Sequence, residues 1–257
     1  MSAFNEVLSI LLGLSHQMWS RWMPFRSQSG PPEVAWDLVG MLFGILCAVV
    51  YTDLVGLPLA TFIYELPALE GWYGLLGVTP GAVVIAANLL FGDLVVYATH
   101  RWLHSETLWH THAWHHASRH LWWLSGLRGS PVHMLLTLLP YTLANVIFLP
   151  PDPRMLTGVI IFGMVNQHWL HSNVRLPWPA LIEKVFVTPR YHFVHHSADV
   201  RFTNTNYAFV FTFWDRLFGT YTDPARVPAD ELLGLDYENS HVRLLLGLPP
   251  PRGARAS

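Results

Sequence analysis

The sequence predicts an all-helical, multi-pass membrane protein with about four transmembrane helices and a helical cap on the cytoplasmic side. Apolar residues make up 52% of the 257-residue chain and charged residues only 12%, about half of their ~25% share in soluble domains. Four apolar stretches approach the roughly 20 residues that a helix needs to cross a bilayer. The chain also holds 15 histidines and a single cysteine, Cys47. A thiolate zinc site, an iron–sulfur cluster and an internal disulfide are therefore excluded.

Residues 1–33 are predicted to form an interfacial segment rather than a cleaved signal peptide. Their apolar stretch has no basic residue before it, although a signal peptide would require one. Trp19, Arg21 and Trp22 follow this stretch and have side chains that favour the headgroup level of a membrane.

Four spans follow this segment in order along the chain. The first lies within residues 34–64 and leads into an external loop that ends at residue 80. The others are expected at residues 81–102, 131–150 and 155–170. The last of these is short, so it is tilted or only partly spanning. The turn PDPR before it makes the last two spans a tight hairpin.

The basic residues predict the orientation, because cytoplasmic loops carry an excess of Lys and Arg. The loop at residues 65–80 has none. With both termini in the cytoplasm, of a bacterial inner membrane or the endoplasmic reticulum, every basic residue except Arg154 lies inside. Nearly all histidines then lie at the cytoplasmic face, and residues 224–257 form a tail. The formal net charge of −2 gives no reason to expect a nucleic-acid partner.

The histidines form boxes with helical spacing. His100 and His104 are four residues apart at the end of the second span, so their rings point to one side of a helix. The spacing HxxHH then occurs twice, at His112, His115 and His116 and at His192, His195 and His196. Neutral imidazole suits Zn, Cu, Fe and Ni. Because eight such ligands exceed what one ion can use, the boxes predict more than one metal ion.

Five further histidines have weaker signals. His168 and His171 lie on adjacent turns at the end of the fourth span. His171 is the stronger candidate ligand, whereas His168 either binds metal or only lines the site. His110, His120 and His133 fall outside the spacings and are interpreted as interfacial residues or as residues that contact a ligand ring.

A carboxylate inside the second span is predicted to serve the first box. Asp93 precedes His100 by two turns on the same helical face, and a charge inside a span is costly enough to suggest a function. We expect Asp93 to accept a hydrogen bond from a ligand ring and so to set the tautomer of that ring.

These motifs resemble the fatty acid hydroxylase, or sterol desaturase, superfamily of integral membrane di-iron oxygenases. The likeness covers roughly residues 88–221 and includes HRWLH, HTHAWHH, HSNVRLPWP, TPRYHFVHHS and NTNYAFVFTFWDRLFGTY. It implies a catalytic domain at residues 81–223, two iron ions in a histidine cage, and O2 with an external electron donor as cosubstrates. Carried over by position, the metal ligands would be His100, His104, His112, His115, His116, His171, His192, His195 and His196.

The chain departs from the family pattern at one expected ligand. The family has a histidine four residues before the one that matches His171, where this chain has Gln167, so His168 is the candidate for a tenth ligand. Asn206, Tyr207 and Asp215 are candidate catalytic residues that would pack over the cage or hydrogen bond to it. The alternative is that their segment is a structural helix that docks on the cap.

The resemblance implies O2-dependent hydroxylation or desaturation of a membrane lipid such as a sterol, a fatty acyl chain or an ether lipid. No cytochrome b5 or ferredoxin sequence is evident in the chain, so a separate electron-transfer protein of either kind is expected.

Zinc is expected to compete for the cage in purified samples, because imidazole sites bind it more tightly than iron(II). The alternatives are a non-catalytic metal-binding membrane protein and a zinc-dependent membrane hydrolase, although the HExxH motif of such hydrolases is missing.

Overall fold

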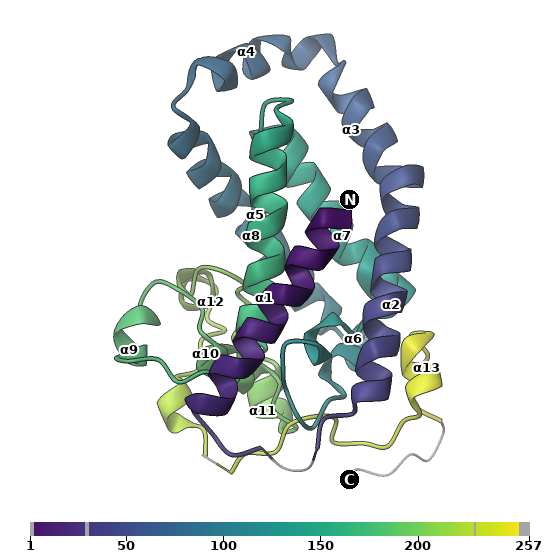
Figure 1. Ribbon diagram of the computed structural model, residues 1–257, viewed down its shortest axis with the longest axis vertical. Coiled ribbons are helices and arrows are strands. Elements are labelled where there is room, and N and C mark those ends of the chain that lie inside the picture. The colour runs from purple at the N-terminus through teal and green to yellow at the C-terminus, as the bar shows by residue number, and fades with distance from the viewer. Residues whose placement is uncertain (1–2, 29–30, 229, 252–257) are drawn as a thin grey trace.

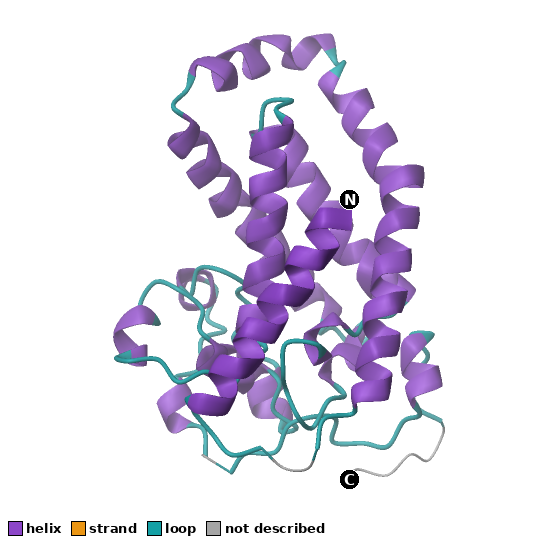
Figure 2. Ribbon diagram, in the orientation of Figure 1, coloured by secondary structure: helices purple, strands orange, loops and turns teal. Residues whose placement is uncertain are grey.

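A computed structural model describes residues 3–28, 31–228 and 230–251, and the regular structure within these ranges is helical (Figure 2). The long helices form a bundle, and short helices and loops form a cap at one end of it (Figure 1). The predicted all-α class is confirmed.

Three helical segments of the described ranges are long and apolar enough to cross a membrane. The first, Val34–Tyr64, consists of α2 (Val34–Tyr51), a π-helical turn (Thr52–Gly56) and α3 (Leu57–Tyr64). The others are α5 (Gly81–Leu103) and α7 (Pro131–Phe148). Many apolar side chains of these segments, such as Leu42 and Leu54, are exposed, as expected where lipid surrounds them. The chain is therefore an integral, multi-pass membrane protein.

The fourth predicted span is a helix, but it is not among these three candidates. This helix, α8 (Pro153–Leu170), has 18 residues, and Asn166, Gln167 and His168 make its last turn polar. Three of the about four predicted spans are thus candidates by length and composition, and the crossing of the membrane by α8 stays a prediction. Alongside α8 lies α1 (Ala3–Trp22), whose N-terminal end reaches about halfway along the bundle (Figure 1). The interfacial position of residues 1–33 stays a prediction.

Small and amide side chains join α5 to α7 inside the bundle. Asn88 donates hydrogen bonds to the carbonyl of Ala144 at 3.2 Å and to the side chain of Asn145 at 3.1 Å. Gly92 faces Ala144, so the two helices approach closely, as helices in membranes commonly do at small residues. At the end far from the cap, α4 (Glu70–Val78) completes the connection between α3 and α5 (Figure 1).

The cap consists of short helices and the loops between them. The helices are α6 (Trp109–His116), α9 (Pro179–Ile182), α10 (Pro189–His195), α11 (Val200–Thr203), α12 (Phe213–Leu217) and α13 (His241–Leu245). In α10, Thr188 accepts a hydrogen bond from the N–H of Tyr191, and Pro189 occupies the first turn. Both features favour a helix start at this point, which places the last histidine box on a helix.

A buried ion pair holds the cap on the bundle. Arg128, in the loop after the second box, donates from Nε to Asp37 in α2 at 2.7 Å and pairs with Glu33 at 3.0 Å. Trp122 also donates to Asp37 at 2.7 Å. A buried charge is tolerated only when it is paired and hydrogen bonded. These contacts therefore anchor the loop next to α6 at the start of the first span.

Candidate metal centre

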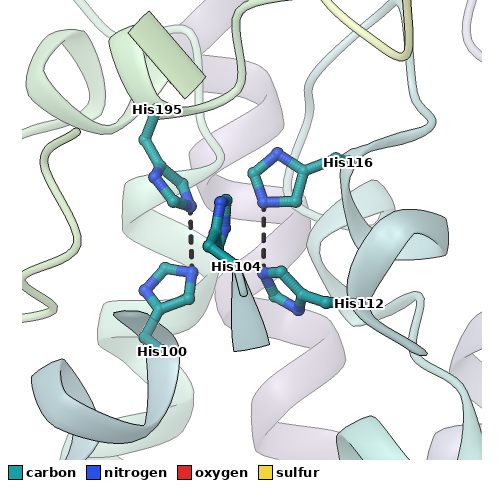
Figure 3. Close-up of side chains that lie close together, drawn as sticks. All are labelled: His100, His104, His112, His116 and His195. Atoms are coloured by element: carbon teal, nitrogen blue, oxygen red, sulfur yellow. Dashed lines mark hydrogen bonds between the residues drawn. The ribbon is translucent and has the colours of Figure 1, made fainter. Parts of the chain in front are cut away.

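Nine histidine rings meet in two adjacent groups where the bundle joins the cap. The five-histidine group is His100, His104, His112, His116 and His195 (Figure 3), and the four-histidine group is His115, His171, His192 and His196. The candidate ligand atoms of each group lie within 4.8 Å of one another. Below, the nine residues are called the cage. They are the nine that the boxes and the resemblance predicted as metal ligands, and the ends of α5 and α8 bring them together with α6 and α10.

Each HxxHH box contributes to both groups, but in opposite proportions. In α6 the outer histidines, His112 and His116, belong to the five-histidine group and His115 to the other. In the box of α10 the outer pair belongs to the four-histidine group, and only His195 to the five. Residues four apart lie nearly in line along a helix, whereas adjacent residues such as the last two histidines of a box are about 100° apart around it. One box can therefore serve two metal ions.

The rings of the cage direct their Nε2 atoms at one another. The Nε2–Nε2 distance is 2.9 Å between His100 and His195 (Figure 3) and 3.2 Å between His171 and His192. Two nitrogens that each lie about 2.1 Å from one ion, at right angles, are about 3 Å apart. A set of bare imidazole nitrogens at this spacing fits metal ions, since a cation between them would offset the repulsion of their lone pairs.

Backbone carbonyls set the tautomers of three cage rings. The Nδ1 atoms lie 2.8–2.9 Å from carbonyl oxygens, His100 from Tyr207, His195 from Thr205 and His171 from Gln167. A carbonyl can only accept, so Nδ1 carries the proton and the lone pair of the neutral ring is on Nε2. Each of these rings therefore presents its ligand atom to the cage, as the outer partners of metal-binding histidines usually ensure.

Burial keeps the cage histidines neutral. Desolvation lowers the pKa of His171 to about 4 and the pKa values of His116 and His196 well below the ordinary value. Repulsion between neighbouring rings acts in the same direction. Because metal binding requires the neutral ring, the cage is in its binding form at neutral pH.

A further histidine that the spacings left unassigned contacts the cage directly. The Nδ1 of His133, in the first turn of α7, lies 2.7 Å from Nδ1 of His112, and the two rings stack with centroids 4.7 Å apart. One nitrogen must donate and the other accept, and when His112 donates, its Nε2 is left to bind metal. Of the two interpretations of His133, the structure shows the contact with the ring of a candidate ligand. The pair is 21 residues apart in sequence, so helical spacing carries no signal for it.

Asp93 does not have the partner that was predicted. Its carboxylate accepts hydrogen bonds from the backbone N–H groups of Phe209, Val210 and Phe211, at 3.3, 2.9 and 2.8 Å. It bonds to no histidine ring in the described ranges, so the prediction that it sets a ligand tautomer is wrong. Three backbone donors satisfy the buried carboxylate instead, and they come from a segment more than a hundred residues away.

Asp215 holds the adjoining part of the same segment. Its carboxylate accepts from the backbone N–H groups of Tyr207 and Ala208, both at 2.9 Å. Asp93 and Asp215 therefore fix the backbone of residues 207–211 from two sides. Because the carbonyl of Tyr207 orients His100, the two carboxylates act on the cage through the backbone.

Asn206 and Tyr207 have different relations to the cage. Asn206 is buried with φ of +56°, and its side chain donates to the carbonyl of Thr222 at 3.0 Å and accepts from the N–H of Thr222 at 2.8 Å. The Tyr207 ring packs edge-on against His104, with centroids 5.1 Å apart. Tyr207 thus packs over the cage as predicted, whereas Asn206 and Asp215 shape the loop around it. A catalytic role for any of the three stays a prediction.

His168 lies outside both histidine groups. Its ring packs edge-on against Trp123, with centroids 5.1 Å apart. Gln167, at the position where the family has a histidine, donates from its side chain to the carbonyl of Gly126 at 2.6 Å. The geometry supports nine ligands, and it gives His168 a packing contact in place of the tenth ligand position.

The fold and the cage define the class of the protein, a helical membrane protein with histidine groups suited to two metal ions. The Fatty acid hydroxylase family model matches residues 85–220, just over half of the chain. The chain belongs to this family, as the resemblance predicted.

Several named relatives are similar to parts of the chain. The ornithine lipid hydroxylase OlsE of Rhizobium tropici is 30% identical over 60% of the chain and 46% of its own length. Human alkylglycerol monooxygenase is 29% identical over 50% of the chain and 28% of its own length. The very-long-chain aldehyde decarbonylase GL1-8 of Oryza sativa subsp. japonica is 28% identical over 71% of the chain and 69% of its own length. The match thus spans less than half of the first two relatives, and no solved structure matches the chain.

Proposed function

We propose that this chain is an O2-dependent di-iron oxidoreductase that hydroxylates, or desaturates, a C–H bond of a membrane lipid. The observation that carries the proposal is the pair of five- and four-histidine groups within a fatty acid hydroxylase domain. Two bound iron ions would supply activation of O2 and removal of hydrogen from an unactivated carbon. The nine cage histidines are the residues that would hold them.

The contribution of the chain itself is to hold the ligand nitrogens and to exclude water. His116, His171, His195 and His196 are completely buried. The carbonyls of residues 167, 205 and 207 keep Nε2 of their ring partners unprotonated. Rings fixed in this way need little rearrangement when metal binds, which favours one defined geometry.

Hydroxylation converts C–H to C–OH, and the second oxygen atom leaves as water after taking up two electrons and two protons. We propose that a separate electron-transfer protein, cytochrome b5-like or ferredoxin-like, supplies the electrons. We also propose that both termini and the cap are cytoplasmic, in a bacterial inner membrane or the endoplasmic reticulum, where such donors are found.

The relatives support a polar lipid with a long alkyl chain as the substrate class. Their names specify an ornithine lipid in one case and an alkylglycerol in another. In this chain His100 and His104 lie at the end of a candidate membrane span. A lipid chain from the bilayer would therefore have a short path to the cage.

The hydrolase alternative lacks a general base at the cage. Both histidine groups of the described ranges are free of carboxylates. Glu183, which is buried, is paired with Arg190 at 2.5 Å, and Glu106 is exposed. A zinc hydrolase needs a carboxylate beside the metal-bound water, so the donor set favours the oxygenase.

The test is metal content and O2 uptake of the full chain, purified in detergent and reconstituted anaerobically with iron(II). About two irons per chain and reductant-dependent O2 uptake are expected for the wild type, and loss of the uptake for His115→Ala and His195→Ala. His110→Ala is the matched control, because His110 lies on α6 but outside both groups. One tightly held zinc ion, with no O2 uptake from any donor, would overturn the proposal.

A further inference from the structure

An exposed apolar surface lies on the cap beside the bundle, on the side of α9 and α12 (Figure 1). The residues that form it are here called the platform: Trp178, Leu181, Val185, Phe186, Leu217 and Phe218. Between 45% and 78% of each of these residues is exposed. Soluble surfaces rarely gather so many large apolar side chains without a partner.

The platform is a fixed surface rather than a loose loop. The N–H of Thr212, just before α12, donates to the carbonyl of Val185 at 3.0 Å, and the hydroxyl of Thr212 donates to the carbonyl of Glu183 at 3.0 Å. The rings of Phe186 and Phe211 pack with centroids 5.8 Å apart. The segment that follows α9 is therefore joined to α12, and its apolar side chains cannot turn inward without breaking these bonds.

The platform lies against the cap end of a candidate span. The Phe218 ring stacks on Tyr97 of α5 with centroids 5.2 Å apart. Trp102, five residues after Tyr97 in the same helix, is 56% exposed, and exposed tryptophans favour the membrane–water interface. The platform thus contacts the end of α5 that carries this tryptophan.

The charges around the platform are positive. Arg175, Lys184 and Arg216 are exposed. The acidic residues of the same segments, 175–190 and 209–221, are Glu183 and Asp215, and both are buried and hydrogen bonded. Aromatic and aliphatic side chains ringed by Lys and Arg match the boundary between anionic headgroups and acyl chains. A second copy of this chain would bring the same positive charges and be repelled.

We propose that the platform inserts into the headgroup layer of the leaflet next to the cap, so that the bilayer itself covers it. The contacts of Glu183 with Thr188 and Arg190, at 2.6 and 3.1 Å, join the platform to the start of α10. Docking on the bilayer would therefore hold the last histidine box at a fixed depth relative to the lipid. The inference does not depend on the identity of the metal or of the reaction.

The test uses the full chain in nanodiscs that contain phosphatidylcholine and phosphatidylglycerol. In a Cys47→Ser background, a bimane label is attached to Leu181→Cys or to Leu217→Cys. Leu42→Cys, in α2, is the reference for a lipid-facing position, and Val200→Cys, equally exposed on α11, is the reference for a position on the cap away from the platform. Quenching by doxyl-labelled lipid and by iodide is measured for each label.

Quenching of the two platform labels by doxyl lipid is expected to be comparable with that at Leu42→Cys and several-fold greater than at Val200→Cys. Quenching by iodide should follow the opposite order. Strong iodide quenching with little doxyl quenching would show that the platform faces water and would overturn the proposal. Protection from both quenchers would overturn it as well, since it would show a protein on the platform, either another copy or a separate partner.

Discussion

The two histidine groups differ in how firmly their rings are held. In the five-histidine group, four rings have a polar partner at Nδ1, which is a backbone carbonyl, the side chain of Asn204 or the ring of His133. In the four-histidine group, only His171 has one. The Nδ1 atoms of His115, His192 and His196 are buried without a hydrogen bond in the described part of the chain.

The difference follows from one segment of the cap, residues 204–207. Asn204, Thr205 and Tyr207 each provide a partner for a ring of the five-histidine group, and Asp93 and Asp215 hold the backbone that continues from them. A ring that is already oriented loses less freedom when it binds metal. We therefore expect the five-histidine group to bind its ion more tightly than the four-histidine group.

The largest effect is expected from removing one ligand of each group. His195→Ala and His196→Ala change neighbouring residues that belong to different groups. His196→Ala should lose nearly all of one ion, whereas His195→Ala should keep part of its ion because other rings of that group stay oriented. Metal per chain after dialysis against a chelator measures both. Equal losses in the two variants would remove the proposed difference between the groups.

Removing the partner of His112 should weaken chiefly the five-histidine group, because the contact of His133 with His115 in the other group is a ring stack without a hydrogen bond. His133→Leu leaves the Nδ1 of His112 without its hydrogen bond, and loss of such an outer partner typically lowers metal affinity by about 10–100-fold. Titration against a chelating indicator, which resolves two binding steps, checks this. His110→Leu serves as the control. An equal loss of affinity in both steps would instead indicate general damage to the cap.

A smaller effect is expected from weakening the support of residues 207–211. In Asp215→Asn, an NH2 group replaces one of the two oxygens and so places a donor against the N–H of either Tyr207 or Ala208, which should cost about 1–3 kcal/mol of stability. Thermal unfolding in detergent measures this cost, and metal titration should show a weaker first binding step. Asp223→Asn, at the half-buried cap of a short turn, should change both quantities less. Wild-type stability in Asp215→Asn would contradict the assigned role.

The smallest effect on metal binding is expected at His168. Because His168 lies outside both groups, His168→Leu should retain both ions and change the contacts of this side chain with Trp123. Metal analysis of the purified variant tests this directly. If one ion were lost, His168 would be the tenth ligand after all, and the four-histidine group would be incomplete as described.

Much of this protein can be predicted from local pattern. Apolar stretches of sufficient length predicted the spans, and the spacings HxxxH and HxxHH predicted which histidines face the same way, because helical periodicity is a local property. The helix α8 was the exception among the predicted spans, because it is not among the candidates by length and composition. The polar residues at the end of α8 lie beside the cage, so its sequence reflects the site as well as the membrane.

The tertiary structure alone decided how the ligands are divided and what holds them. The sequence does not show that the two HxxHH boxes contribute in opposite proportions, because this depends on how α6 and α10 are oriented relative to each other. Nor does it show that Asp93 bonds residues 209–211 or that His133 meets His112, since these contacts join segments with no periodic relation. Helical spacing thus determined which histidines form the cage, and packing between distant segments determined the metal group to which each one belongs.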